Sequence, residues 1–117
     1  MQTQEACDLV KKRCVPCEGG IPKYSLAEAE RQIENHPEWR ISGEGQRIRR
    51  DWQAPNFRAA MQFFHLVAEL AEAENHHPDL HLEGYRNVTI EIWTHAIGGL
   101  SENDFILAAK IDELGWE

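Results

Sequence analysis

The spacing of apolar residues along the chain changes between the period of a helix and the period of a strand. From Asn56, a good N-cap, to about Glu74, apolar side chains recur every three or four positions, which predicts a long amphipathic helix. Its predicted stripe consists of Phe57, Ala60, Met61, Phe64, Val67, Ala68 and Ala71. In residues 88–93, apolar side chains at 88, 90 and 92 alternate with the others, and this period of two predicts a half-buried strand.

Capping residues predict where two more helices begin. Ser25 and Glu28 have the spacing of a capping box, in which each side chain accepts a backbone N–H that the helix leaves unsatisfied. We expect that helix to end near residue 35, before a proline. Ser101 and Asp104 repeat the capping-box spacing and predict the start of a last helix.

The remaining segments predict two strand pairs. Residues 39–42 and 46–52 flank a glycine-rich turn, which indicates a hairpin, and residues 79–82 form a short strand before the one at 88–93. The order is helix, two strands, helix, two strands, helix (α-β-β-α-β-β-α). It predicts an α+β fold: a four-stranded antiparallel sheet with helices packed on one face.

Length and charge limit the architecture and the class of partner. The chain has 117 residues and a net charge of −8. A chain of this size buries about two thirds of its unfolded surface, which is enough for one core. The surplus of negative charge argues against nucleic acid as a partner. No apolar run approaches the roughly 20 residues that span a membrane, and the polar start predicts no secretory signal. We therefore expect a cytoplasmic protein without a membrane partner.

The first 24 residues differ from the rest and predict an N-terminal arm laid over a single domain of residues 25–117. The arm carries all three cysteines, Cys7, Cys14 and Cys17, an odd number that does not favour a disulfide scaffold. Cys14 and Cys17 form a C-x-x-C pair, but no second pair completes a tetrahedral metal site, so zinc there would need Cys7 or a histidine folded back onto the pair. No strand-to-helix context suggests redox use either, so the sequence favours plain thiols.

Four of the six histidines, His76, His77, His81 and His95, fall within 20 residues, near a predicted helix end and a predicted strand end. Zinc binding is one hypothesis, but its usual spacing is missing. Adjacent His76 and His77 cannot both point at one ion from a helix, and Pro78 keeps His77 and His81 off a shared helical face. A structural reading is also open, because imidazoles and a following proline are common where a helix ends.

The other chemical hypothesis is general acid–base catalysis without a metal. Imidazole suits it because both of its protonation states are populated near neutral pH. Glu72 lies one helical turn before His76, and a carboxylate there could orient an imidazole, although a solvated helix face explains Glu72 equally well. Asp104 is explained by capping, but a capping side chain also sits at the mouth of a helix. Both roles can therefore coexist at Asp104.

Three ordered motifs resemble the signature of the pterin-4a-carbinolamine dehydratases over residues 24 to about 114. They are H-H-P at residues 76–78, V-x-I-x-I-x-T-H at 88–95 and G-L-S-x-x-D at 99–104. Members of that family have an α+β fold and dehydrate 4a-hydroxytetrahydropterin, which aromatic amino acid hydroxylases release, to quinonoid dihydropterin. The resemblance thus implies a hydro-lyase of tetrahydrobiopterin recycling that uses neither a metal nor an organic cofactor.

The resemblance also implies roles for individual residues. His76 and His95 match the acid–base histidines of the family, His77 matches a third histidine of the pocket, and Glu72 and Asp104 match its acidic neighbours. The stretches that bind the reduced pterin substrate supply His76, His77, Pro78, Thr94, His95, Ala96 and Ile97. No metal ligand is implied.

Assembly and a competing function stay open. The resemblance implies a homodimer or homotetramer, and a non-catalytic oligomeric regulatory or binding protein of the same fold is the alternative. The partnership of animal members with a homeodomain transcription factor is not carried over. Trp93 replaces a small polar residue of the family, and we expect it, with Glu91 and Thr89, on an outer face that a partner or the arm covers. His36, His65 and His81 are expected to be structural or surface residues.

Overall fold

The structure, a computed structural model, describes residues 3–14 and 22–115. Its helices and strands are α1 (Ala6–Leu9), α2 (Leu26–Ile33), β1 (Arg40–Ser42), β2 (Arg47–Gln53), α3 (Phe57–Glu74), β3 (Asp79–Glu83), β4 (Asn87–Ile92) and α4 (Glu102–Asp112). Short 3-10 turns, η1 (Gly43–Gly45) and η2 (His95–Ile97), follow β1 and β4. Every element predicted from residue 25 onward is present, and α1 is an element that the sequence did not predict.

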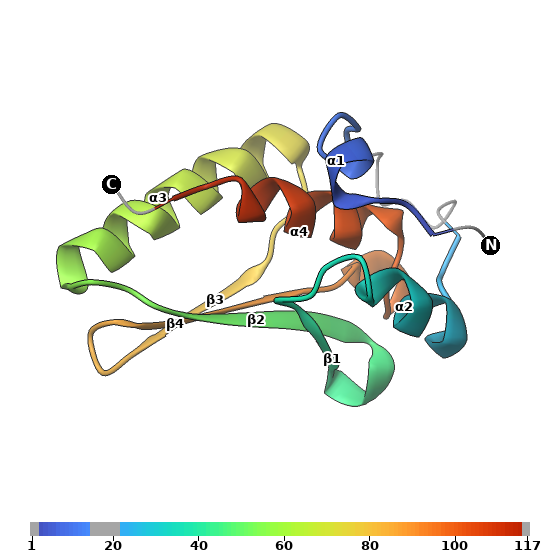
Figure 1. Ribbon diagram of the computed structural model, residues 1–117, viewed down its shortest axis with the longest axis horizontal. Coiled ribbons are helices and arrows are strands. Elements are labelled where there is room, and N and C mark those ends of the chain that lie inside the picture. The colour runs from blue at the N-terminus through green and yellow to red at the C-terminus, as the bar shows by residue number, and fades with distance from the viewer. Residues whose placement is uncertain (1–2, 15–21, 116–117) are drawn as a thin grey trace.

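The strands form one antiparallel sheet in the order β1-β2-β4-β3, which confirms the predicted α+β fold. Ile48 of β2 pairs with Ile92 of β4, and both are fully buried. The neighbouring pair, Arg49 and Glu91, points to the opposite face because side chains alternate along a strand. Figure 1 shows α3 and α4 over one face of the sheet, and α2 beside β1. The other face carries the polar side chains.

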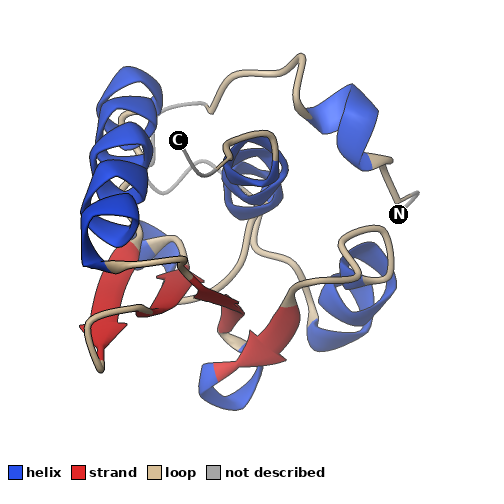
Figure 2. Cartoon of the chain, turned by 60° about the vertical axis from the view of Figure 1, so that its left-hand side comes forward, coloured by secondary structure: helices blue, strands red, loops and turns tan. Residues whose placement is uncertain are grey.

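Helix α4 lies at the centre of the helical layer. Figure 2 shows it between α3 on one side and α1 and α2 on the other. It is buried almost all round, and its buried residues are Asn103, Asp104, Phe105, Ile106, Leu107, Ala108, Ala109 and Ile111. The first turn of this enclosed helix carries Asp104, which is fully buried.

The prediction of which apolar residues form the buried stripe of α3 was wrong in part. The residues that α3 buries are Ala59, Ala60, Phe63, Val67, Ala71 and Glu74. Phe57 and Met61 instead expose 53% and 47% of their surface. The helix thus has a second apolar stripe that faces outward. Neither α3 nor any other helix within the described residues is long and apolar enough to cross a membrane.

The described part of the N-terminal arm packs against the helical layer. Leu9 of α1 is fully buried in the main core. Two reciprocal hydrogen bonds fix the arm to α2: the N–H of Gln4 donates to Oε1 of Gln32 (2.8 Å), and Nε2 of Gln32 donates to the carbonyl of Gln4 (2.7 Å). Cys17 lies outside the described residues, and with it the C-x-x-C pair.

Candidate active site

The end of α3 sets the direction of His76. Asn75, the residue after the helix, has a left-handed backbone (φ 51°, ψ 42°), which asparagine adopts more readily than most residues. The N–H of His76 still donates to the carbonyl of Ala71 in the last turn (3.1 Å). The chain therefore turns off the helix axis at Asn75, and the side chain of His76 points inward, with 5% of its surface exposed.

His76 forms a buried pair with Asp104. Its Nε2 lies 2.7 Å from Oδ1 of Asp104, and the aspartate side chain is fully buried. A carboxylate at this distance fixes the orientation of the ring. The two partners come from elements 28 residues apart in the chain, the end of α3 and the start of α4.

The other oxygen of Asp104 is held by two donors. Oδ2 accepts the N–H of Ser101 (2.8 Å) and the hydroxyl of Thr94 (2.9 Å). The Ser101 bond is half of the capping box predicted from the sequence, and the box is confirmed. These bonds offset the cost of removing the carboxylate from water. A single side chain thus caps α4 and orients His76.

Glu72 lies on His77 and not on His76. Its Oε2 is 2.5 Å from Nε2 of His77, and both side chains are largely exposed, at 76% and 57%. Glu72 thus contacts an imidazole of the His-His pair, but the ring is that of His77 and not that of His76, the histidine one helical turn away in the sequence. Four-residue spacing brings side chains together only while the helix continues, and α3 ends before His76 because Asn75 is left-handed. After Asn75 the chain folds back, so that His77 lies beside Glu72 in the last turn of α3.

A tight loop after β4 positions His95. Thr94 and Gly99 form an isolated antiparallel bridge, with 2.8 Å from the N–H of Thr94 to the carbonyl of Gly99. The turn η2 fills the loop between them, and Gly98 closes it with a positive φ of 61°, which glycine adopts without strain. This bridge buries Thr94 against Ser101 and Asp104 and leaves His95 exposed.

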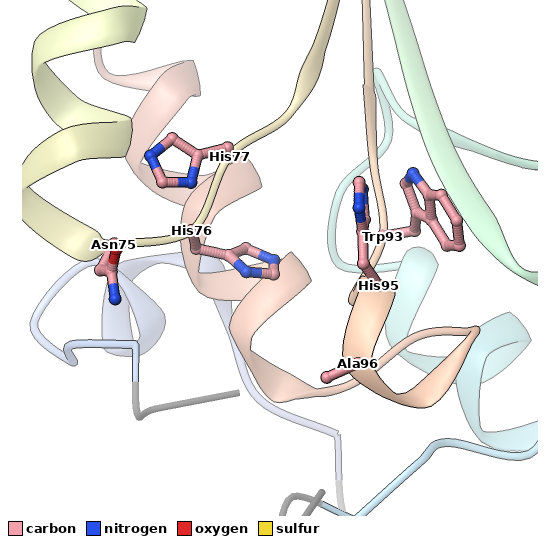
Figure 3. Close-up of a pocket in the computed structure, with 6 residues that line it drawn as sticks. All are labelled: Asn75, His76, His77, Trp93, His95 and Ala96. Atoms are coloured by element: carbon pink, nitrogen blue, oxygen red, sulfur yellow. The ribbon is translucent and has the colours of Figure 1, made fainter. Parts of the chain in front are cut away.

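The two histidine segments enclose one pocket. It has a volume of about 260 Å³ and is lined by Asn75, His76, His77, Trp93, His95 and Ala96. Figure 3 shows His76 and His77 on one side and His95 with Trp93 on the other. The volume is near the lower end for ligand pockets, which suits a small ring system. Imidazoles that face a ring from two sides can give a proton at one atom and take one at another.

The structure brings together most of the residues that the sequence singled out. His76, His77, His95 and Ala96 line the pocket, whereas Thr94 and Asp104 lie behind His76. Pro78 and Ile97 are partly buried and are not among the lining residues.

Sequence reasoning did not include two lining residues, Asn75 and Trp93, in the site. For Asn75 the available signal was an asparagine directly before the His-His pair, a common helix end. Trp93 was expected on the outer face of the sheet. It does continue that face, but the pocket begins where the sheet ends.

Among the described residues, two places outside this pocket offer groups that a ligand could contact. The only described group of three or more His, Cys, Asp or Glu side chains with ligand atoms within 4.8 Å of one another is Glu5, Cys7 and Asp8, which are exposed on and just before α1. None of these lines the pocket. A hollow of about 410 Å³ on α3 is lined by Arg58, Met61, Gln62, His65 and Leu66. It is larger than the histidine pocket but holds a single imidazole and no carboxylate, so it offers no acid–base pair.

Known proteins that are similar to this chain share one description. The sequence model of the family described as pterin 4 alpha carbinolamine dehydratase matches residues 22–114. A protein of Methylococcus capsulatus, provisionally named a pterin-4-alpha-carbinolamine dehydratase, is 44% identical over 113 residues, which cover 97% of this chain and 98% of the relative. The mitochondrial pterin-4-alpha-carbinolamine dehydratase 2 of Arabidopsis thaliana is 47% identical over 92% of this chain and 59% of its own length.

A solved structure has the same fold. The crystal structure of a transcriptional coactivator/pterin dehydratase from Brucella melitensis matches with a TM-score of 0.72 over 79% of this chain and 97% of that chain. The two sequences are 24% identical. This likeness supports the arrangement of helices and strands described above.

Proposed function

Because this chain belongs to the pterin-4a-carbinolamine dehydratase family, we propose that it dehydrates a 4a-hydroxytetrahydropterin to the quinonoid dihydropterin by histidine acid–base catalysis. His76 and His95 are the proposed acid–base pair, and His77 is a third imidazole at the substrate. Asp104 supports His76, and Glu72 supports His77. The substrate is the carbinolamine that aromatic amino acid hydroxylases release, so the reaction belongs to tetrahydrobiopterin recycling.

The chemistry requires two proton transfers on one ring. The C4a–O bond breaks, and the departing hydroxyl takes up a proton and leaves as water. The proton on N5 is removed, and the electron pair of that N–H bond forms the N5–C4a double bond. No electrons are gained or lost overall, so two positioned imidazoles are sufficient.

The observation that carries this proposal is the buried His76–Asp104 pair in the same pocket as His95. Oδ1 of Asp104 lies 2.7 Å from Nε2 of His76, and both imidazoles line a pocket of about 260 Å³. A scaffold protein has no need of a buried carboxylate–imidazole pair at the wall of a small pocket, since burying such groups costs free energy.

A stopped-flow assay tests the proposal directly. The hydroxylation product is generated in one syringe, and decay of the carbinolamine is followed with and without the purified chain from about pH 6 to about pH 8.5, the range in which imidazole titrates. Acceleration proportional to enzyme concentration is expected. If the decay keeps its spontaneous rate throughout this range, the chain is not a dehydratase, and the non-catalytic binding protein becomes the better hypothesis.

We also propose that the chain self-associates and acts in the cytoplasm. Self-association is supported by the outward stripe of α3, where Phe57 and Met61 are about half exposed beside a hollow of about 410 Å³. Light scattering after gel filtration should give a dimer or tetramer for the wild type and a smaller species for a Phe57→Glu, Met61→Glu variant. Cell fractionation tests the location.

A further inference from the structure

Trp93 forms the wall of the pocket beside His95. The two rings lie with their centroids 4.1 Å apart and their planes at 34°. Figure 3 shows Trp93 on the side of His95 that faces away from His76 in that view. The indole is partly buried, and it lines the pocket together with the three histidines.

His95 has few other means of keeping its orientation. His76 is bonded to Asp104 and His77 to Glu72, but within the described residues no hydrogen bond or ion pair holds the ring of His95. The residue is also exposed and stands at the start of the short turn η2. The stack on Trp93 is therefore the contact that restricts rotation of this imidazole.

Trp93 is itself fixed at its edge and on its face. Its Nε1–H donates to Oδ2 of Asp79 (3.3 Å), and the guanidinium carbon of Arg47 lies 4.6 Å from a ring centroid. Arg47 also pairs with Asp79 and with Glu91, each at 3.8 Å. Asp79 directly follows the His-His-Pro turn, so the Trp93–Asp79 bond joins the segment of His76 and His77 to the segment of His95.

We propose that Trp93 is a positioning residue for His95, and that Asp79 and Arg47 hold it in place. The inference rests on the proposed catalytic role of His95. A base or acid must keep its ring nitrogen within hydrogen-bond reach of the reacting atom, and a freely rotating imidazole spends little time in that geometry. The stack on Trp93 fixes the orientation of the His95 ring, as the bond to Asp104 fixes that of His76.

The test compares Trp93→Leu, which removes the stacking partner, with Trp93→Phe, which keeps an aromatic ring. Trp52→Phe is the matched control, because Arg50 lies 4.5 Å from a Trp52 ring in the same way, but no histidine is stacked there. For each variant, the ring C–H resonances of His95 are recorded by NMR, and kcat and KM are measured in the dehydration assay. Urea unfolding checks that every variant is folded.

For Trp93→Leu, we expect the His95 resonances to lose the upfield shift that a stacked indole causes, and kcat to fall about tenfold with KM changed less than threefold. Trp93→Phe should recover kcat to within about threefold of the wild type. Trp52→Phe should leave both the His95 resonances and kcat near their wild-type values.

Three results would overturn the inference. Unshifted His95 resonances in Trp93→Leu would mean that the stack does not exist in solution. A shift without a loss of kcat would mean that the orientation is irrelevant to turnover. A rise in KM at constant kcat would make Trp93 a substrate contact instead. A wild-type protein without dehydratase activity would contradict the proposed function alone, because the NMR comparison would still decide whether Trp93 orients His95.

Discussion

Glu74, the last residue of α3, forms an ion pair with Lys110 of α4, with 2.7 Å between Oε2 and Nζ. The two side chains expose 4% and 15% of their surface. The other oxygen of Glu74 accepts the backbone N–H of Cys14 in the N-terminal arm (2.8 Å). Burial raises the pKa of Glu74, but the bonds from Lys110 and Cys14 outweigh it, so this pKa lies below its usual value. One carboxylate thus joins the arm, α3 and α4, next to the segment of His76.

We predict that Lys110→Met destabilises the protein by about 3 kcal/mol, because it leaves a buried carboxylate without its cation. The double variant Glu74→Leu, Lys110→Met should recover most of that loss, since it buries no charge. Urea unfolding at neutral pH measures both free energies. A single variant that is no less stable than the double variant would contradict the buried pair.

The lowered pKa of Glu74 also leads us to predict how the stability of the protein depends on pH. Because the folded-state pKa of Glu74 is lowered, its contribution is present above the unfolded value of about 4.3 and is lost as the pH falls through the folded value. The unfolding free energy of Glu74→Gln should therefore fall less steeply than that of the wild type below about pH 5. Parallel curves for the two proteins would refute the lowered pKa.

His76→Ala and His95→Ala should each lower turnover by about 10²-fold or more, in keeping with the loss of a general acid or base. His65→Ala is the matched control, because His65 is exposed on α3 and pairs with Glu69 away from the pocket. Its turnover should stay close to that of the wild type. Near-normal rates in both folded pocket variants would remove the basis for histidine catalysis.

Asp104→Asn should damage stability and turnover together. The amide cannot provide the two charged acceptor oxygens that serve His76, Ser101 and Thr94, so we expect a loss of about 2 kcal/mol and about 10²-fold in kcat. Ser101→Ala is the comparison: it removes a hydroxyl that is bonded to Thr94 but keeps the carboxylate. It should cost about 1 kcal/mol, with kcat changed less than about fivefold. If the two variants lost kcat equally, Asp104 would have no role in turnover beyond its structural one.

We predict a second effect of pH on stability, near neutral pH, that arises from His36. The ring is buried, with 1% of its surface exposed, and burial lowers its pKa although Asp112 opposes the shift. The unfolded chain then binds a proton more readily than the folded one, so stability is lost as the pH falls below about 6.5. His36→Leu should flatten the urea-unfolding free energy between about pH 7.5 and pH 5.5 by up to about 1.4 kcal/mol per pH unit. His65→Ala should leave the slope unchanged, and an unchanged slope in His36→Leu as well would disprove the effect.

Signals between near neighbours in the sequence predicted the elements. The capping boxes at Ser25 and Ser101 place donor and acceptor three residues apart, so the pattern itself holds the geometry, and both boxes are present. The strand at residues 87–92 followed in the same way from its period of two. The predicted order of elements needed no information from distant parts of the chain.

Contacts that depend on distant parts of the chain were harder to predict. The α3 sequence has two apolar stripes, and only packing against the sheet and α4 decides that Phe63 is buried and Phe57 exposed. Leu9 becomes core because α4 lies beneath it, although its own segment has no helical period. Glu72 contacts His77 because Asn75 adopts a left-handed backbone at the end of α3, a conformation that the sequence did not predict. The His-His-Pro turn and Thr94-His95 were identified from sequence, but the bond from His76 to Asp104 needed the closed fold.

The double attachment of Asp104 has a consequence for how this protein can evolve. The carboxylate caps the first turn of α4 with one oxygen and orients an imidazole with the other, so a substitution there is penalised both as a folding defect and as a defect of the proposed chemistry. A lineage that lost the activity would still be selected to keep the aspartate for stability. Asp104 is thus expected to be retained more often than His95 in relatives that have become inactive.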